Sequence, residues 1–185
     1  LSDLLDEEGV AQVFDLEMQV LEVLADMERT GVCVDQDLLA VLDNEFAERT
    51  EEARLMAWAA AGETFNLASV PTKQRLLFTP KKDGGQGLRG TVLTPAGEKK
   101  VRAGGTPELS DYSTSAKALQ TFASKSELAQ ALLDHAKFGK LRTTYTRPYL
   151  GGDRTRQRGN KEATEWVESR VVDGRIHTRY IQSRV

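Results

Sequence analysis

The chain has 185 residues, of which 39% are hydrophobic and 29% are charged, and its formal net charge at pH 7 is −3. This length is sufficient for a domain with a real core, and the sequence lacks the run of about 18 apolar residues typical of a membrane-spanning helix. The single cysteine, Cys33, excludes an internal disulfide, and Cys33 with His135 and His177 does not have the spacing of a zinc site.

Charge is divided unevenly along the sequence. Residues 1–60 contain 16 acidic side chains against three arginines, a net charge of −13, whereas residues 61–185 contain 22 basic and 12 acidic side chains, a net charge of +10. The first part repels phosphate and the second part attracts it. This division favours a protein that presents one face to a nucleic acid and keeps the other in solvent.

Two long helices are predicted in the first 62 residues. The first follows the apolar spacing that begins near Val13, has Ser2 as its cap and ends at Gly31. Residues 32–34 are too few and too β-branched to continue it, so we expect an extended link to Asp35, a good N-cap for the second helix. Because this link is short, we expect the two helices to lie antiparallel.

The next segment combines a short helix with a glycine-rich excursion. Ser69 is expected to cap a helix that runs toward Phe78, with Lys73 pointing outward as part of a phosphate seat. Residues 79–112 are rich in glycine, proline and basic residues, so we expect a long, flexible, basic tip. The glycines of this tip lack the spacing of a nucleotide-binding loop.

Helical character returns after the hydroxyl-rich segment 113–115. Such a segment indicates a helix cap in the first place, and an anion-binding site only as the second interpretation. Ser126 then caps a longer helix that ends in the basic stretch KFGKLRTTYTRPY, residues 137–149. Its cations have no acidic neighbour in the sequence, and its threonines and tyrosines supply hydroxyls, so the stretch suits a row of phosphates. The alternative is a solvated helix end whose cations favour the negative end of the helix dipole.

In the last part of the chain, the spacing of apolar residues changes from that of a helix to that of a strand. Residues 151–161 are predicted to form a second cationic loop. Residues 165–171 and 175–181 alternate by two on either side of Asp173 and Gly174, which predicts a β-hairpin.

Five short motifs follow one another along the chain: MERTGVCVD at 27–35, GETFNLAS at 62–69, STSA at 113–116, KLRTTY at 140–145 and DGRIHTRYIQ at 173–182. In this order, they resemble motifs of the family A, polymerase I type, DNA polymerases. The resemblance implies a mainly α (α+β) fold with a helical thumb over residues 1–150, including the flexible tip at 79–112. Residues 151–185 would be the basic loop and β-hairpin that begin the palm.

The resemblance also implies a function and a set of contacts. The chain would be a fragment of a DNA-directed DNA polymerase, a nucleotidyltransferase of replication or repair, whose thumb grips primer-template duplex through its phosphate backbone. The expected DNA-binding residues are Asn66, Ser69, Lys73, Ser113, Thr114, Ser115, Lys140, Arg142 and Thr144. Ala68 stands where the family often has a polar residue, and the tip is longer than is usual in the family.

No catalytic residue or metal ligand is assigned. In the family, the two carboxylates that hold two magnesium ions come later in the chain, so this segment is expected to be inactive alone. Asp111 precedes STSA rather than the continuation of a palm carboxylate motif, and it is rejected for that reason. Expected partners are primer-template DNA, the rest of the palm and fingers, and optionally a processivity partner at the tip, in a bacterial or phage-infected cytoplasm.

Two other hypotheses stay open from the sequence. One is a self-standing, non-catalytic nucleic-acid-binding module. The other is a helical interaction module whose acidic first half binds a protein and whose cations only add solubility.

Overall fold

The computed structural model describes residues 11–158 and 161–180, without the side chains of residues 153–163. The predicted cap Ser2 lies outside these ranges. The chain divides into two compact units. One extends from Val41 to Thr146, and the other combines the described residues before and after it.

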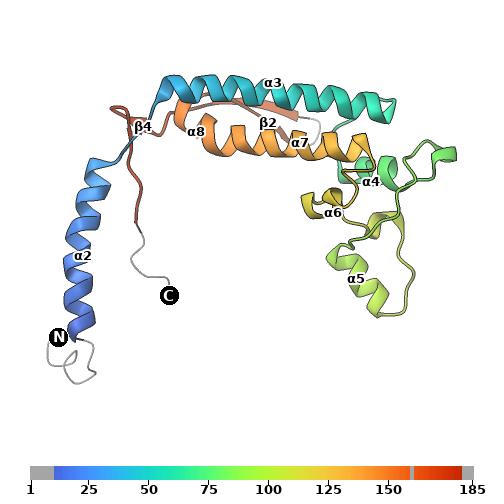
Figure 1. Ribbon diagram of the computed structural model, residues 1–185, viewed down its shortest axis with the longest axis horizontal. Coiled ribbons are helices and arrows are strands. Elements are labelled where there is room, and N and C mark those ends of the chain that lie inside the picture. Colours follow the sequence, from blue (N-terminus) through green and yellow to red (C-terminus); the bar gives the residue numbers. More distant parts are fainter. Residues whose placement is uncertain (1–10, 159–160, 181–185) are drawn as a thin grey trace. The chain divides into compact units, whose positions relative to one another are not determined.

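The unit from Val41 to Thr146 is helical (Figure 1). Its elements are α3 (Gln36–Ala61), which enters from the other unit, α4 (Val70–Phe78), α5 (Pro95–Arg102), α6 (Ala116–Gln120), α7 (Glu127–Leu141) and the π-helix η3 (Arg142–Thr146), with the short 3-10 turns η1 (Lys81–Asp83) and η2 (Leu109–Asp111). Ser69, Ser115 and Ser126 cap α4, α6 and α7 through their side chains, as the sequence predicts.

Helices α3 and α7 lie side by side and antiparallel in this unit (Figure 1). Asp43, near the start of α3, contacts Arg142, just past the end of α7, and the rings of Phe46 and Phe138 lie 6.3 Å apart. The sequence predicts a different antiparallel partner for α3, namely the preceding helix, α2 (Ala11–Thr30). This helix belongs to the other unit. That pairing stays a prediction.

The core of this unit forms where α4, α6 and α7 meet. Leu77 is fully enclosed, Leu76 and Leu128 are nearly so, and the ring of Phe78 packs edge-on against Phe122 with centroids 6.2 Å apart. Leu76, Leu77 and Phe78 are consecutive, so the C-terminal end of α4 is buried on more than one side. Packing against α7 stabilises α4 and α6, which are too short to be stable alone.

The tip at 79–112 has defined secondary structure, whereas the sequence predicts a flexible excursion. The backbone N–H of Leu88 donates to the carbonyl of Leu77 at 2.9 Å, and the N–H of Thr94 donates to the carbonyl of Asp111 at 2.8 Å. Leu93 also forms a β-bridge with Tyr112. These backbone partners are distant in sequence, so local composition does not reveal them. The flexibility of the tip stays a prediction.

Asp111 holds the tip together through charge-assisted hydrogen bonds. Its Oδ2 accepts from the backbone N–H of Glu108 at 2.8 Å and from Lys100 Nζ at 3.1 Å. The Glu108 N–H and then the Lys100 ammonium hold the pKa of Asp111 below its usual range. Gly97 lies directly against this residue, since an added Cβ would come within 2.6 Å of the Asp111 carbonyl oxygen.

We expect Asp111 to make the tip sensitive to acid. Because its folded pKa is lowered, its stabilising contribution is complete above the ordinary carboxyl pKa and is lost as the pH falls through the folded value. Thermal unfolding midpoints measured from about pH 6 to about pH 2 should therefore fall less steeply in Asp111→Asn than in the wild type. Asp83→Asn, at an exposed carboxylate of the same tip, is the control. Parallel curves for wild type and Asp111→Asn would contradict this role.

The second unit contains α2 and a small sheet. Strand β1 (Val32–Cys33) pairs with β5 (Arg175–Ile176), which pairs with β4 (Val171–Val172), all antiparallel. The predicted hairpin is therefore confirmed, with Asp173 and Gly174 at φ 50° and 72°, as a type I′ turn requires. Its strands are shorter than predicted, and the third strand comes from the extended link after α2.

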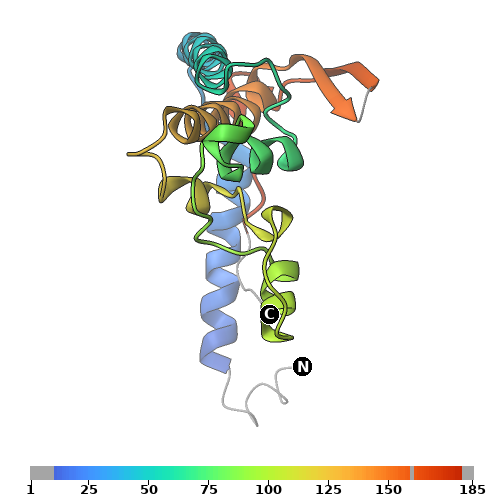
Figure 2. The same cartoon turned by 90° about the vertical axis from the view of Figure 1, so that its right-hand side faces the viewer.

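The segment after α8 (Arg147–Leu150) forms a ribbon rather than the predicted cationic loop. Strand β2 (Gly152–Arg158) pairs antiparallel with β3 (Lys161–Val167), and the two lie side by side in Figure 2. The sequence reading missed this because it assigned residues 165–167 to the later hairpin. Within the described ranges, no helix is both long enough and apolar enough to cross a membrane.

Candidate nucleic-acid interface

The turn before α4 is built from local hydrogen bonds. Asn66 is exposed, and its Oδ1 accepts from the backbone N–H of Ala68 at 2.8 Å. The Ser69 hydroxyl accepts from the N–H of Thr72 at 3.4 Å and lies 2.8 Å from the Thr72 hydroxyl. These contacts hold the start of α4 in one conformation and leave the Asn66 amide nitrogen open to solvent.

Lys73, for which the sequence predicts an outward direction, is half-buried. Burial lowers its pKa, because the charged ammonium loses part of its hydration. His135, on α7, is also half-buried, and burial followed by the positive charges of Arg54 and Lys73 lowers its pKa. In the described ranges, no carboxylate pairs with Lys73. A phosphate bound near its ammonium would therefore compensate for the lost hydration by a charge-assisted hydrogen bond.

The hydroxyl cluster before α6 is only partly accessible. The Ser113 hydroxyl donates to Ser115 Oγ at 3.0 Å, and Ser115 Oγ accepts from the N–H of Ala118 at 3.4 Å. Thr114 is 8% exposed. Gln74 of α4 donates to the carbonyl of Tyr112 at 2.7 Å, directly before this cluster. Gln74 thus links the predicted phosphate-binding segment at the start of α4 to the one before α6.

The basic stretch at the end of α7 contains two kinds of cation. Lys140 and Thr144 are exposed, as a surface for phosphates requires. Arg142 is half-buried, and its Nε donates to the Oδ1 and Oδ2 of Asp43 at 3.2 and 3.3 Å. The sequence shows no acidic neighbour for Arg142, because Asp43 precedes it by 99 residues.

Asp43 is the residue at this site that the sequence analysis missed. It is 5% exposed, and its Oδ1 also lies 2.6 Å from the hydroxyl of Thr146, which is 1% exposed. One acidic residue among the many on α3 carries no sequence signal of burial. Only the packing of α3 against η3 distinguishes it.

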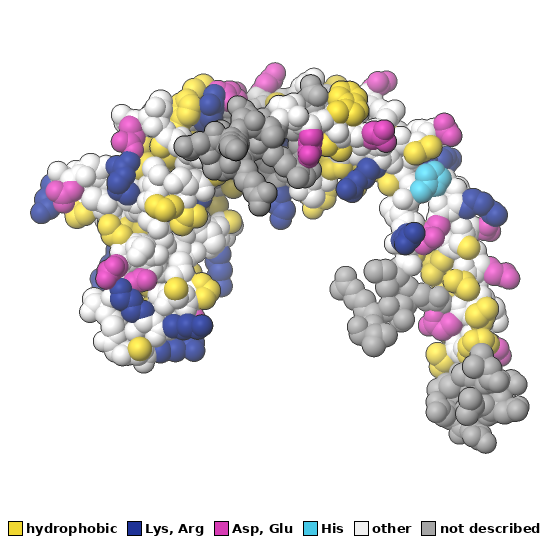
Figure 3. Space-filling view, turned by 180° about the vertical axis from the view of Figure 1, so that it is seen from behind, with side chains coloured by type: hydrophobic (Ala, Val, Ile, Leu, Met, Phe, Trp, Pro, Cys, Tyr) yellow, Lys and Arg dark blue, Asp and Glu magenta, His cyan; other side chains and the backbone are white. Residues whose placement is uncertain are grey.

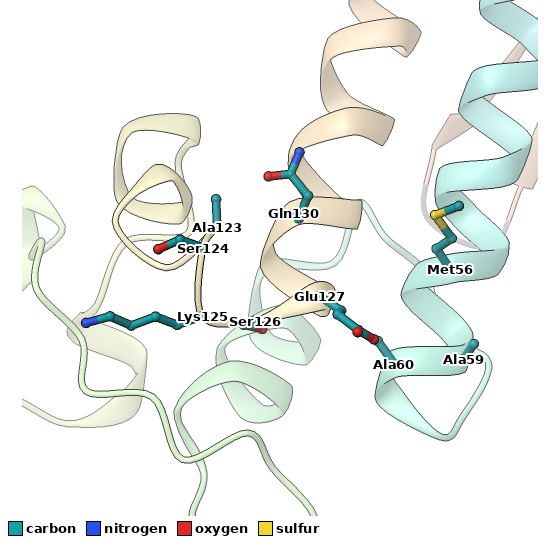
Figure 4. A pocket seen from close by; sticks show the side chains of 9 residues that line it. All are labelled: Met56, Ala59, Ala60, Ala123, Ser124, Lys125, Ser126, Glu127 and Gln130. Atoms are coloured by element: carbon teal, nitrogen blue, oxygen red, sulfur yellow. The ribbon is translucent and has the colours of Figure 1, made fainter.

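A groove lies between the end of α3 and the start of α7 (Figure 4). Its volume is about 650 Å³, and it is lined by Met56, Ala59 and Ala60 of α3, the turn 123–126, and Glu127 and Gln130 of α7. Its lining combines Met56 and alanines with Ser124, Lys125, Ser126, Glu127 and Gln130. We assign no chemistry to it.

The described residues do not fit the magnesium site of a polymerase. Nowhere within them do three His, Cys, Asp or Glu side chains gather closely enough to hold a metal ion. Asp43 and Asp111, the two buried carboxylates in the described part of the chain, are each paired with a cation. No catalytic step is therefore assigned to these residues.

Comparisons with known proteins connect these features to one family. No family model matches the chain. It is 27% identical to DNA polymerase I of Lactococcus lactis over 98% of its length, and 32% identical to DNA polymerase I of Rhizobium leguminosarum over 75%. A solved structure, the POL domain of Pol1 from M. smegmatis in complex with DNA primer-template and dNTP, superposes with a TM-score of 0.65 at 26% identity, over 98% of this chain. The chain is homologous to a segment of the family A DNA polymerases.

This homology confirms the family resemblance and the mainly helical fold that the motifs predict. The chain spans 17% of the Lactococcus protein, 12% of the Rhizobium protein and 26% of the solved polymerase chain. The thumb and palm boundaries at residue 150 and the nine DNA-binding residues stay predictions.

Proposed function

We propose that this polymerase segment grips primer-template duplex through its phosphate backbone, as the thumb and the beginning of the palm of a DNA-directed DNA polymerase. The observation that carries the proposal is the exposed surface at the end of α7, where Lys140 and Thr144 follow each other on consecutive turns. The solved relative with DNA primer-template supports the choice of duplex DNA as the ligand. Bacterial or phage-infected cytoplasm would be its place of action.

The tip adds positive charge to the same unit. Lys and Arg side chains gather at the end that holds α5 (Figure 3). Lys81, Lys82, Arg89 and Lys99 are exposed, and none of them has a carboxylate partner within the described ranges. Lys100, in contrast, is neutralised by Glu108 and Asp111. We infer that the four free cations extend the phosphate-binding surface, as a basic finger or a docking site for a processivity partner.

Nucleotidyl transfer is assigned to the complete polymerase rather than to this segment. The chemistry uses two magnesium ions that activate the primer hydroxyl and neutralise developing phosphate charge. Since the described residues do not fit such a site, the carboxylates and the nucleotide-binding fingers would come from other parts of a polymerase. This segment's contribution is then duplex binding and primer placement.

Fluorescence anisotropy with a labelled primer-template tests the proposal. Binding should weaken steeply with salt and should not depend on the base sequence of the duplex, because phosphate contacts release counterions and read no bases. The chain's folded state is checked first by circular dichroism. A folded chain that binds no duplex at low salt would overturn the proposal.

Lys140→Ala is expected to weaken binding about equally for all duplex sequences and to reduce the salt slope by about one. The reason is that Lys140 is exposed and would contact one phosphate. Arg29→Ala, in the acidic first part of the chain, is the control for the loss of one positive charge. A sequence-dependent loss in Lys140→Ala, or an equal loss in Arg29→Ala, would contradict the assignment.

The exposed apolar side chains of α2 favour a second candidate, a helical interaction module. None of the described residues of this helix is buried, and Val13, Leu16 and Val23 are each more than half exposed. Such a face usually binds another protein surface. Sedimentation of the chain tests this candidate. The candidate is favoured if the chain binds no DNA but self-associates, and if Leu16→Glu abolishes the self-association.

A further inference from the structure

Asp43 is a charged side chain enclosed between α3 and η3. Its side chain is 7% exposed, and its carboxylate contacts Arg142 through both oxygens and Thr146 through one. A carboxylate out of water is stable only when it is paired and hydrogen-bonded. Arg142 and Thr146 belong to one five-residue π-helix, so the carboxylate links α3 to that helix at two points. Short π-helices of this kind are often found at functional sites.

The contact uses one edge of the Arg142 guanidinium and leaves the opposite edge open. Only Nε donates to Asp43, at 3.2 and 3.3 Å. In the described part of the chain, neither Nη1 nor Nη2 has a hydrogen-bond partner, and the side chain is 31% exposed. Because the guanidinium is planar, fixing Nε also fixes the direction of the two η nitrogens. This pair of donors matches the spacing of two phosphate oxygens.

We propose that Asp43 is a positioning residue for phosphate binding: it holds Arg142 through Nε so that its two η nitrogens receive one DNA phosphate. The proposal deepens the proposed function and rests on it. Lys140 and Thr144 lie two residues before and after Arg142, so the three side chains would bind neighbouring points of the backbone. Orienting the guanidinium before binding reduces the entropy lost when the phosphate binds.

A carboxylate beside an arginine also has an opposing effect. It reduces the positive potential that attracts a polyanion. Removing the charge of Asp43 would strengthen DNA binding if that effect dominated, and would weaken binding if positioning dominated. The sign of the change therefore decides between the two roles.

The test compares the wild type and four variants of the full chain by anisotropy with the same primer-template. Asp43→Asn removes the charge with little change in shape, and Glu48→Gln removes one charge from an exposed residue of the same helix. Arg142→Lys keeps the positive charge without the fork of donors. We expect Asp43→Asn and Arg142→Lys to bind about three to ten times more weakly than Glu48→Gln. The double variant should bind no more weakly than Arg142→Lys alone, because Asp43 acts through the guanidinium.

The outcomes separate this inference from the proposed function. If the wild type binds and Asp43→Asn binds as tightly as Glu48→Gln or more tightly, positioning is overturned while duplex binding stands. If the folded wild type does not bind, both are overturned. Should circular dichroism show that Asp43→Asn is unfolded, Arg142→Lys decides, and wild-type affinity in that variant would overturn the inference.

Discussion

Replacing Leu77 with alanine is expected to lower the free energy of unfolding by about 2 to 5 kcal/mol. Leu77 is fully enclosed on α4, at the centre of the core that α4, α6 and α7 share. Its removal leaves a cavity that the surrounding helices fill only in part. The carbonyl of Leu77 also accepts from the N–H of Leu88 at 2.9 Å, so a shift of α4 would loosen the tip as well.

Urea unfolding, followed by circular dichroism, measures this effect. Leu55→Ala, which removes the same atoms from a side chain that is 51% exposed on α3, is the control. It should change the free energy of unfolding by less than about 1 kcal/mol, since little apolar surface leaves water at that position. Equal shifts in the two variants would show that the core is not centred on Leu77.

Replacing Arg142 with alanine is expected to destabilise the chain by about 1 to 3 kcal/mol, the usual effect of removing a charged hydrogen-bond partner from a buried carboxylate. Asp43 would lose both contacts with Arg142 Nε and keep its contact with the hydroxyl of Thr146. Adding Asp43→Asn to Arg142→Ala should restore part of the loss, because the uncompensated charge is then removed. The stabilities of Arg142→Ala and of the double variant are measured from their urea unfolding midpoints.

Lys140→Ala is the matched control for Arg142→Ala. It removes an exposed cation two residues away, so its free energy of unfolding should stay within about 0.5 kcal/mol of the wild type. If Arg142→Ala is as stable as Lys140→Ala, the ion pair with Asp43 makes no net contribution. The comparison also shows why Arg142→Ala is a poor test of DNA binding, since it changes stability and phosphate contacts together.

Local features of the sequence determined much of this protein. The spacing of apolar residues and the caps Ser69 and Ser126 predicted helices that the structure contains, and Asp173 with Gly174 predicted a turn that requires positive φ. These features depend on neighbours within a few residues, so the sequence displays them directly. The ordered motifs likewise indicated family A polymerases.

Tertiary structure alone decided the rest. The pairing of β1 with β5 joins Val32 to Ile176, and the ion pair of Asp43 with Arg142 joins residues 99 positions apart. Backbone hydrogen bonds also join distant parts of the tip, as between Thr94 and Asp111. Contacts of this range form only when packing brings the segments together, and no local pattern records which acid or which strand edge will be buried. For the same reason, the sequence could name Arg142 as a phosphate contact but could not show the carboxylate that orients it.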